Sequence, residues 1–192
     1  MLILASASPR RRALLTRMGV QFRSEAADVD ETSAARLIPE DLALEFARRK
    51  ARAVAGRHPN AIVLGADTIV VAADGEVLGK PRDADDASRM LRKLSGTTQR
   101  VITGVCVLHA GVETRDAVTT RVTMRSITAH EIGTYVASGE PFDKAGAYAI
   151  QETGDRFVTD VDGSWTNVVG LPTRRVTQML RMAGVLVPER AR

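Results

Sequence analysis

The chain has 192 residues, of which 44% are hydrophobic, so it can bury a substantial core and is not expected to be disordered. Its formal charge of +4, from 27 basic and 23 acidic residues, is too mild for a typical duplex-binding protein. Aromatic residues make up 4% of the chain, which argues against a stacking surface for single-stranded nucleic acid. An anionic small molecule is the expected partner.

The sequence also favours a cytoplasmic protein that does not enter the membrane. Cys106 is the single cysteine, so no disulfide can form within the chain, as is usual in a reducing compartment. The apolar start, Leu2 to Ala5, is too short for the core of a signal peptide. No segment approaches the roughly 18 apolar residues of a membrane span.

Apolar periodicity and turn residues predict five elements in the first part of the chain. They are a buried strand over 2–6, a helix over 8–18 capped by Ser8, a short strand over 20–24, a polar loop over 26–39 and a helix from 40 to about 55.

The remaining elements alternate between strands and helices without a strict order. They are strands over 61–72 and 76–79 joined by a turn at Asp74-Gly75, a helix from 83 to about 94, strands over 99–109 and 112–126, a helix over 128–138, short strands over 157–161 and 168–169, and a helix from 171 to about 183. This order predicts a mixed α/β fold with a largely antiparallel, twisted sheet. No linker interrupts the chain, so we expect a single domain over 1–192 with a frayed tail at 188–192.

Positive charge gathers where the first predicted helix begins. The chain passes through Ser6 and Ser8 into three consecutive arginines, Arg10, Arg11 and Arg12. A helix start already carries about half a positive charge and unpaired N–H groups, so this charge is unfavourable unless an anion is present. Successive helical residues point about 100° apart, so at most two arginines can face one ligand. The pattern predicts a phosphate site, with a solvated basic turn as the alternative.

Asp67 interrupts the strand GADTIVV, which is otherwise apolar enough for complete burial. A buried carboxylate is costly unless it is paired, so Asp67 should face a metal, a basic partner or a cavity. A structural hydrogen-bonding role explains a single aspartate equally well. The hairpin that follows can return Lys80 toward Asp67, although a surface lysine is the simpler interpretation.

The stretch DKAGAYAIQ, from Asp143 to Gln151, has an unusual composition for a plain loop. The amide of Gln151 offers both a donor and an acceptor and can read the edge of a nucleobase. Glu31, in an acidic loop, and Lys50, on the second predicted helix, are by themselves typical of solvated surface residues.

Several known catalytic motifs are absent from the sequence. GEVLGKP has the wrong spacing for a P-loop, HEIGT lacks the second histidine of a zinc protease, and no GxSxG is present. The three histidines are scattered, and with one cysteine they predict no zinc cluster. With these motifs excluded, the sequence favours phosphate chemistry, in which Arg, Lys and carboxylate side chains act together with a hard cation.

The motifs together resemble the Maf family of nucleoside triphosphate pyrophosphatases, over roughly residues 2–182. They are, in chain order, SASPRR, VDE, ARRKA, GADTIVV, GKPRD, LSGTTQRVITGV, DKAGAYAIQ and NVVGLP. The resemblance implies an elongated, mixed, twisted sheet flanked by helices, with two lobes and a central cleft, similar to the inosine triphosphate pyrophosphatases. It also implies a homodimer and hydrolysis of a nucleoside triphosphate to the monophosphate and pyrophosphate with a divalent cation, Mg²⁺ or Mn²⁺.

The resemblance also implies roles for individual residues. Asp67 matches the proton acceptor that activates water, and Arg11, Thr68 and Gln151 match positions tied to substrate choice. The further positions that match the lining of the cleft are Ser6, Arg10, Glu31, Lys50, Lys80 and Asp143 or Lys144. Glu31 and Asp67 are the candidate metal ligands.

Base preference is a finer expectation. DKAGAYAIQ is similar to the branch that acts on dTTP and UTP rather than to the branch that prefers 7-methyl-GTP. The chain departs from the commoner pattern at Phe142, at Ala147 and Ala149, where glycine is frequent, and at Trp165, where tyrosine is usual.

Two other functions fit the same residues. The arginines can hold a nucleotide or nucleic acid without hydrolysis, as in a regulator of septum formation. Water attack at the γ-phosphorus instead of the α-phosphorus would make the protein a general phosphatase that releases orthophosphate.

Overall fold

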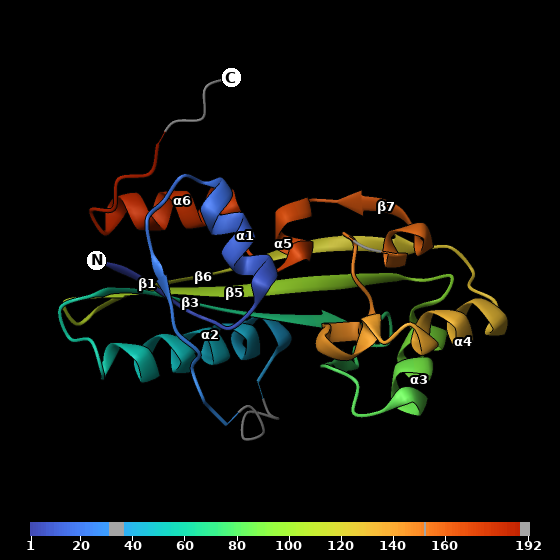
Figure 1. The fold of residues 1–192 in the computed structure, drawn as a ribbon. Helices are drawn as coiled ribbons and strands as arrows, with labels where there is room; N and C mark the ends of the chain where they lie inside the picture. Colours follow the sequence, from blue (N-terminus) through green and yellow to red (C-terminus); the bar gives the residue numbers. More distant parts are fainter. Residues whose placement is uncertain (31–36, 152, 189–192) are drawn as a thin grey trace. The chain divides into compact units, whose positions relative to one another are not determined.

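The computed structural model describes residues 1–30, 37–151 and 153–188 (Figure 1). Glu31 and the last four residues of the predicted frayed tail lie outside the described residues. The strands are β1 (Leu2–Ala5), β2 (Arg23–Ser24), β3 (Ile62–Val71), β4 (Val77–Leu78), β5 (Thr98–His109), β6 (Val112–Met124) and β7 (Val158–Asp162). The α-helices are α1 (Pro9–Arg17), α2 (Pro39–Ala55), α3 (Ala84–Leu94), α4 (Ala129–Ala137), α5 (Trp165–Val169) and α6 (Thr173–Met182). Three short 3₁₀ helices, η1 (Glu140–Asp143), η2 (Ala145–Ala147) and η3 (Thr153–Phe157), complete them.

One seven-stranded mixed sheet, in the order β2-β1-β3-β5-β6-β7 with β4 paired to β3, connects the elements. β1 pairs in parallel with β2 and β3, whereas β4 is antiparallel to β3 and β7 is antiparallel to β6. The predicted mixed α/β fold is confirmed, and β1 is paired in parallel with the strand on each side of it.

The predicted helix starts are confirmed in detail. The side chain of Ser8 accepts from the N–H of Arg11 at the start of α1, and the side chain of Asp83 accepts from the N–H of Asp86 at the start of α3. Thr128 forms a reciprocal capping box with Glu131 at the start of α4. These caps depend on residues three apart in the sequence, which is why a local pattern predicts them.

The strand predicted over 168–169 is wrong, because these residues belong to α5. β-Branched valines favour a strand, but the backbone N–H groups of Asn167 and Val168 donate to the side chain and carbonyl of Ser164 and close a helical turn. The side-chain amide of Asn167 donates to Val101 O and Thr120 Oγ1, both at 3.0 Å, and these bonds hold the turn in place.

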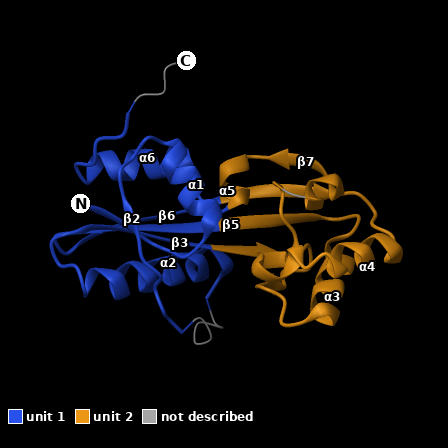
Figure 2. Cartoon of the chain, viewed as in Figure 1, with its two compact units in different colours: residues 1–67, 103–118, 170–192 blue, residues 68–102, 119–169 orange. Residues whose placement is uncertain are grey.

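The chain divides into two compact units (Figure 2). Unit 1 comprises residues 1–67, 103–118 and 170–192, and unit 2 comprises residues 68–102 and 119–169. Within unit 1, α2 lies on one face of the strands and α1 and α6 lie on the other (Figure 1). No helix within the described ranges has the length and apolar character needed to cross a membrane.

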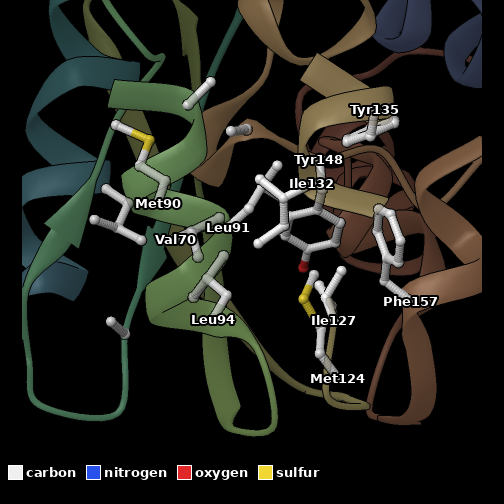
Figure 3. Packing of buried hydrophobic residues seen from close by; sticks show 14 of the residues in the cluster. Val70, Met90, Leu91, Leu94, Met124, Ile127, Ile132, Tyr135, Tyr148 and Phe157 are labelled. Carbon is white, nitrogen blue, oxygen red and sulfur yellow. The ribbon is translucent and has the colours of Figure 1, made fainter. Parts of the chain in front are cut away.

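Unit 2 has its own apolar core, which joins α3 and α4 to the strands. Figure 3 shows Leu91 and Leu94 of α3 facing Ile132 and Tyr148, with Phe157 beside Tyr135. The rings of Tyr135 and Phe157 pack edge to face with their centroids 5.2 Å apart. This core supports the loop that carries DKAGAYAIQ.

Candidate functional site

Unit 1 brings two of the predicted motifs onto neighbouring strands of the sheet. β1 and β3 run parallel, with Ala5 opposite Gly65. Ser6 follows Ala5 directly, and Asp67 lies two residues after Gly65. Because the strands are parallel, both residues lie on the same side of the Ala5–Gly65 pair along the strands. Neighbouring strands lie about 4.8 Å apart. The turn into α1 therefore lies near the backbone of Asp67 in unit 1, whereas the side chain of Asp67 points to the face of the sheet that α2 covers.

The turn from β1 into α1 is held by its own hydroxyl groups. Ser6 Oγ accepts from Ser8 N at 3.2 Å and from Arg11 Nη1 at 3.3 Å, and Ser24 Oγ donates to Ser6 O at 2.6 Å. Arg11 Nε also donates to Gly170 O at 2.9 Å, in the NVVGLP motif. Of the three arginines, Arg11 is thus fixed across the start of the helix.

Asp67 lies against Lys50 of α2. Lys50 Nζ donates to Asp67 Oδ1 at 2.5 Å, and the two side chains are only 13% and 10% exposed. The basic partner predicted for Asp67 is therefore Lys50, which comes from a position whose sequence alone is typical of the surface. Charge-assisted hydrogen bonds of this kind are stronger than neutral ones and hold the carboxylate in one orientation.

Two glycines allow α2 to come close enough for this contact. A Cβ added to Gly65 would overlap Ala47 O, and one added to Gly104 would overlap the backbone of Ala43. Gly65 and Asp67 are two residues apart on β3, so they lie on the same face of the sheet, toward α2. The close approach therefore brings Lys50, one turn along from Ala47, to Asp67.

The described residues offer few ligands for a metal. No group of three or more His, Cys, Asp or Glu side chains that could hold an ion occurs within the ranges that the structure describes, and Glu31 lies outside them. Asp67 alone suits Mg²⁺ or Mn²⁺ bound mainly through substrate phosphates and water, because Mg²⁺ typically keeps several waters and takes one or two carboxylates. It does not suit a cation held entirely by protein.

Unit 2 carries the other group of predicted residues. Leu78 of β4 pairs with Val70 of β3, so the predicted hairpin is confirmed and returns the chain toward Thr68. Gly146 N donates to Gly79 O at 3.0 Å, which joins the loop of DKAGAYAIQ to the residue before Lys80. Thr68, Lys80 and the DKAGAYAIQ loop thus belong to unit 2.

Lys144 is buried, and its contact with substrate stays a prediction. It is 6% exposed, and its Nζ donates to Glu140 O and to Asp143 Oδ1, both at 2.6 Å. Asp143 and Gln151 are exposed. Lys144 therefore supports the loop through Asp143 and the backbone of Glu140.

Sequence reasoning missed Glu140, Tyr135 and Asn167. Each is a polar residue that the structure buries or half-buries with several hydrogen bonds. Asn167 stands in an apolar stretch, as Asp67 does, and this was an available signal. The residues next to Glu140 in the sequence do not distinguish it from a solvent-exposed acidic residue.

A family model for Maf-like proteins matches residues 1–183 of the chain. This chain belongs to the Maf family. The resemblance that the motifs indicated is confirmed over nearly the whole length.

The alignments with three similar Maf proteins span almost the full length of this chain and of each relative. A protein of Koribacter versatilis is 54% identical over 185 residues, which are 96% of this chain and 95% of the relative. One of Myxococcus xanthus is 51% identical over 191 residues (100% and 96%), and one of Pelotomaculum thermopropionicum is 48% identical over 185 residues (95% and 96%). All three are named dTTP/UTP pyrophosphatase.

Proposed function

We propose that this Maf protein hydrolyses a nucleoside triphosphate to the monophosphate and pyrophosphate, with dTTP and UTP as substrates. The observation that carries the proposal is the near-complete match, at 48–54% identity, to relatives named dTTP/UTP pyrophosphatase. The ion pair of Asp67 and Lys50 supports it, because this buried acid lies on the strand next to β1, whose end leads into the turn at Ser6 and the proposed phosphate-binding residues of α1.

Asp67 acts as the general base in this proposal. Its carboxylate takes a proton from a water molecule whose oxygen bonds to the α-phosphorus. The bond from that phosphorus to the oxygen bridging the α- and β-phosphates breaks, and pyrophosphate leaves with the bonding electrons. Lys50, held at Asp67 Oδ1, keeps the carboxylate in place.

Positive groups stabilise the charge that develops on the phosphates. Arg10 and Arg11, with the hydroxyl groups of Ser6 and Ser8, bind phosphate oxygens at the start of α1. Lys80, Thr68 and Gln151 of unit 2 contribute to substrate binding, as the family resemblance implies. A divalent cation at Asp67 would neutralise charge on the leaving pyrophosphate.

The oligomeric state and the cell compartment stay predictions. A homodimer and a cytoplasmic location follow from the family resemblance and from the composition. Light scattering after size-exclusion chromatography tests the first, since a mass near twice 20.7 kDa is expected.

Replacing Asp67 with Asn tests the function and the base together. The wild-type protein with Mg²⁺ is expected to release pyrophosphate from dTTP and UTP, and Asp67→Asn should lower kcat by at least about a hundredfold, because a positioned base typically contributes that much. The variant should still fold, because the amide oxygen of asparagine can accept the hydrogen bond from Lys50, and circular dichroism checks this. Asp162→Asn, which removes an exposed carboxylate from β7, is the matched control and should keep full activity.

The products separate the alternatives. Orthophosphate as the first product would show a general phosphatase, and no product from any common nucleotide would favour the binding regulator. An Asp67→Asn protein with normal kcat would refute the assignment of the base.

A further inference from the structure

The described residues of segment 149–154, which carries Gln151, form a turn whose two ends touch. A Cβ added to Gly154 would stand 2.7 Å from Ala149 O and 3.0 Å from Ala149 N, so only glycine fits there. Gln151, between the two ends, is exposed. In the sequence, Gln151 therefore lies between two chain positions, Ala149 and Gly154, that are close together in space.

Two side chains tie the ends of this turn together. Ala149 N donates to Tyr135 Oη at 3.3 Å, and Tyr135 Oη donates to Glu140 Oε1 at 2.7 Å. Glu140 also accepts from Gly154 N at 3.3 Å and from Thr153 Oγ1 at 2.5 Å. The carboxylate of Glu140 therefore joins both ends, through Tyr135 on one side and directly on the other.

The partner of Glu140 is itself rigid. Tyr135 is 1% exposed, comes from the interior of α4, and packs edge to face on Phe157 in the core of unit 2 (Figure 3). The backbone of Glu140 is held as well, since its carbonyl accepts from the buried Lys144. The turn around Gln151 is thus fastened to the core of unit 2.

Glu140 keeps its charge at neutral pH. Burial favours the neutral acid, but the hydrogen bonds from Thr153, Tyr135 and Gly154 outweigh it and lower the pKa of Glu140 below its usual range. An ionised carboxylate only accepts hydrogen bonds, and all three of these groups donate to it. A neutral amide of the same shape would keep one acceptor oxygen for Tyr135 and Gly154 but would lose the charge and reverse the hydrogen bond with Thr153.

We propose that Glu140 is a positioning residue for base selection and acts through Gln151. The inference rests on the proposed function, in which Gln151 contacts the base. Uracil and thymine present an N3–H donor and an O4 acceptor, whereas cytosine presents an N3 acceptor and an amino donor. An amide that turns by 180° matches either edge, so discrimination requires Gln151 to be held in one orientation.

The test compares the affinities for two nucleotides in four proteins. Dissociation constants of the α,β-imido analogues of UTP and CTP, which are not hydrolysed, are measured by calorimetry for wild type, Glu140→Gln, Gln151→Ala and the double variant. Wild type should prefer the UTP analogue by about tenfold or more, since unpaired polar groups in the site disfavour the wrong base. Each single variant should reduce this ratio several-fold.

The double variant separates positioning from general loosening. If Glu140 acts through Gln151, Glu140→Gln has no further effect on the ratio once Gln151 is alanine, because coupled residues are not additive. Asp155→Asn, which removes an exposed charge from η3 near the same turn, is the control and should keep the wild-type ratio. Thr153→Val removes one donor to Glu140 and replaces Glu140→Gln if that variant does not fold.

Three results would overturn the proposal. They are an equal loss of affinity for both analogues in Glu140→Gln, an undiminished effect of Glu140→Gln in the Gln151→Ala background, and a wild-type protein that binds both analogues equally. Failure of the proposed hydrolysis is distinguishable from these, because it appears as absence of pyrophosphate while the affinity ratios remain measurable.

Discussion

Arg11 shows how a single residue at the start of α1 can be distinguished from its neighbours. Its guanidinium reaches Ser6 Oγ and Gly170 O, whereas Arg12 is exposed one position later. Under the proposed function, Arg11→Ala should raise KM for dTTP about tenfold or more, since a hydrogen bond to a charged group contributes roughly 1.5–3 kcal/mol. Steady-state kinetics at fixed ionic strength measures this effect.

Arg12→Ala is the matched control for that experiment. Both substitutions remove one positive charge from the same helix start, so both relieve the same unfavourable interaction with the helix dipole. Arg12→Ala should leave KM within about twofold of wild type. Equal increases in KM for the two variants would mean that net charge alone, and not the placement of Arg11, attracts the nucleotide.

The residues of the candidate site differ in how far sequence could predict them. The Ser8 cap and the burial of Asp67 follow from local patterns, and both are confirmed. The partner of Asp67 is 17 positions away on another element, and periodicity gives no information about which surface lysine will meet a buried acid. Lys144 illustrates the same limit, because its burial depends on the fold of the loop around it.

At the scale of elements, the approach of α2 to β3 and β5 is decisive for the site. Gly104→Ala should destabilise the protein by about 3 kcal/mol or more, because the added methyl group would overlap the backbone of Ala43, and backbone cannot move aside as a flexible side chain can. Movement of α2 would also draw Lys50 away from Asp67. Urea unfolding measures the first effect, and kcat measures the second.

Gly133→Ala provides the contrasting glycine. Gly133 lies inside α4, is exposed, and a Cβ there would meet nothing within 4 Å. Alanine should therefore stabilise the helix by roughly 0.5–1 kcal/mol. A Gly104→Ala protein as stable and active as wild type would show that α2 tolerates displacement and that the close approach does not position Lys50.

Most of the elements could be predicted from the sequence, and the misses share a physical cause. Helices α1 to α4 and the long strands have apolar periodicity, and α1, α3 and α4 also begin at side-chain caps, so their predictions are confirmed within a few residues. The turn at α5 and the three 3₁₀ helices are short, and tertiary hydrogen bonds such as those of Asn167 decide their conformation. In so short a segment, the local sequence preference is too weak to determine the conformation against such tertiary contacts.

For the whole molecule, two carboxylates with strongly lowered pKa values should contribute to the loss of stability in acid. Hydrogen bonds from the side chain and backbone of Arg82, and from Arg89, lower the pKa of Asp86 from 3.8 to about 2. Hydrogen bonds from Arg125 and then Thr128 lower the pKa of Glu131 from 4.5 to about 2. A pKa lower in the folded than in the unfolded state adds stability above the unfolded value, and this is lost as the pH falls toward the folded value.

The double variant Asp86→Asn/Glu131→Gln tests this linkage. It should be less stable than wild type from pH 5 to pH 8, and the difference in unfolding free energy should shrink steadily between about pH 4.5 and pH 2, where both wild-type carboxylates take up protons. Urea titrations across this range measure it. Asp85→Asn removes a charge from the same turn of α3 without these hydrogen bonds and should have a small effect. A difference that stays constant down to pH 2 would show that the two carboxylates stabilise the fold by packing and not by their charge.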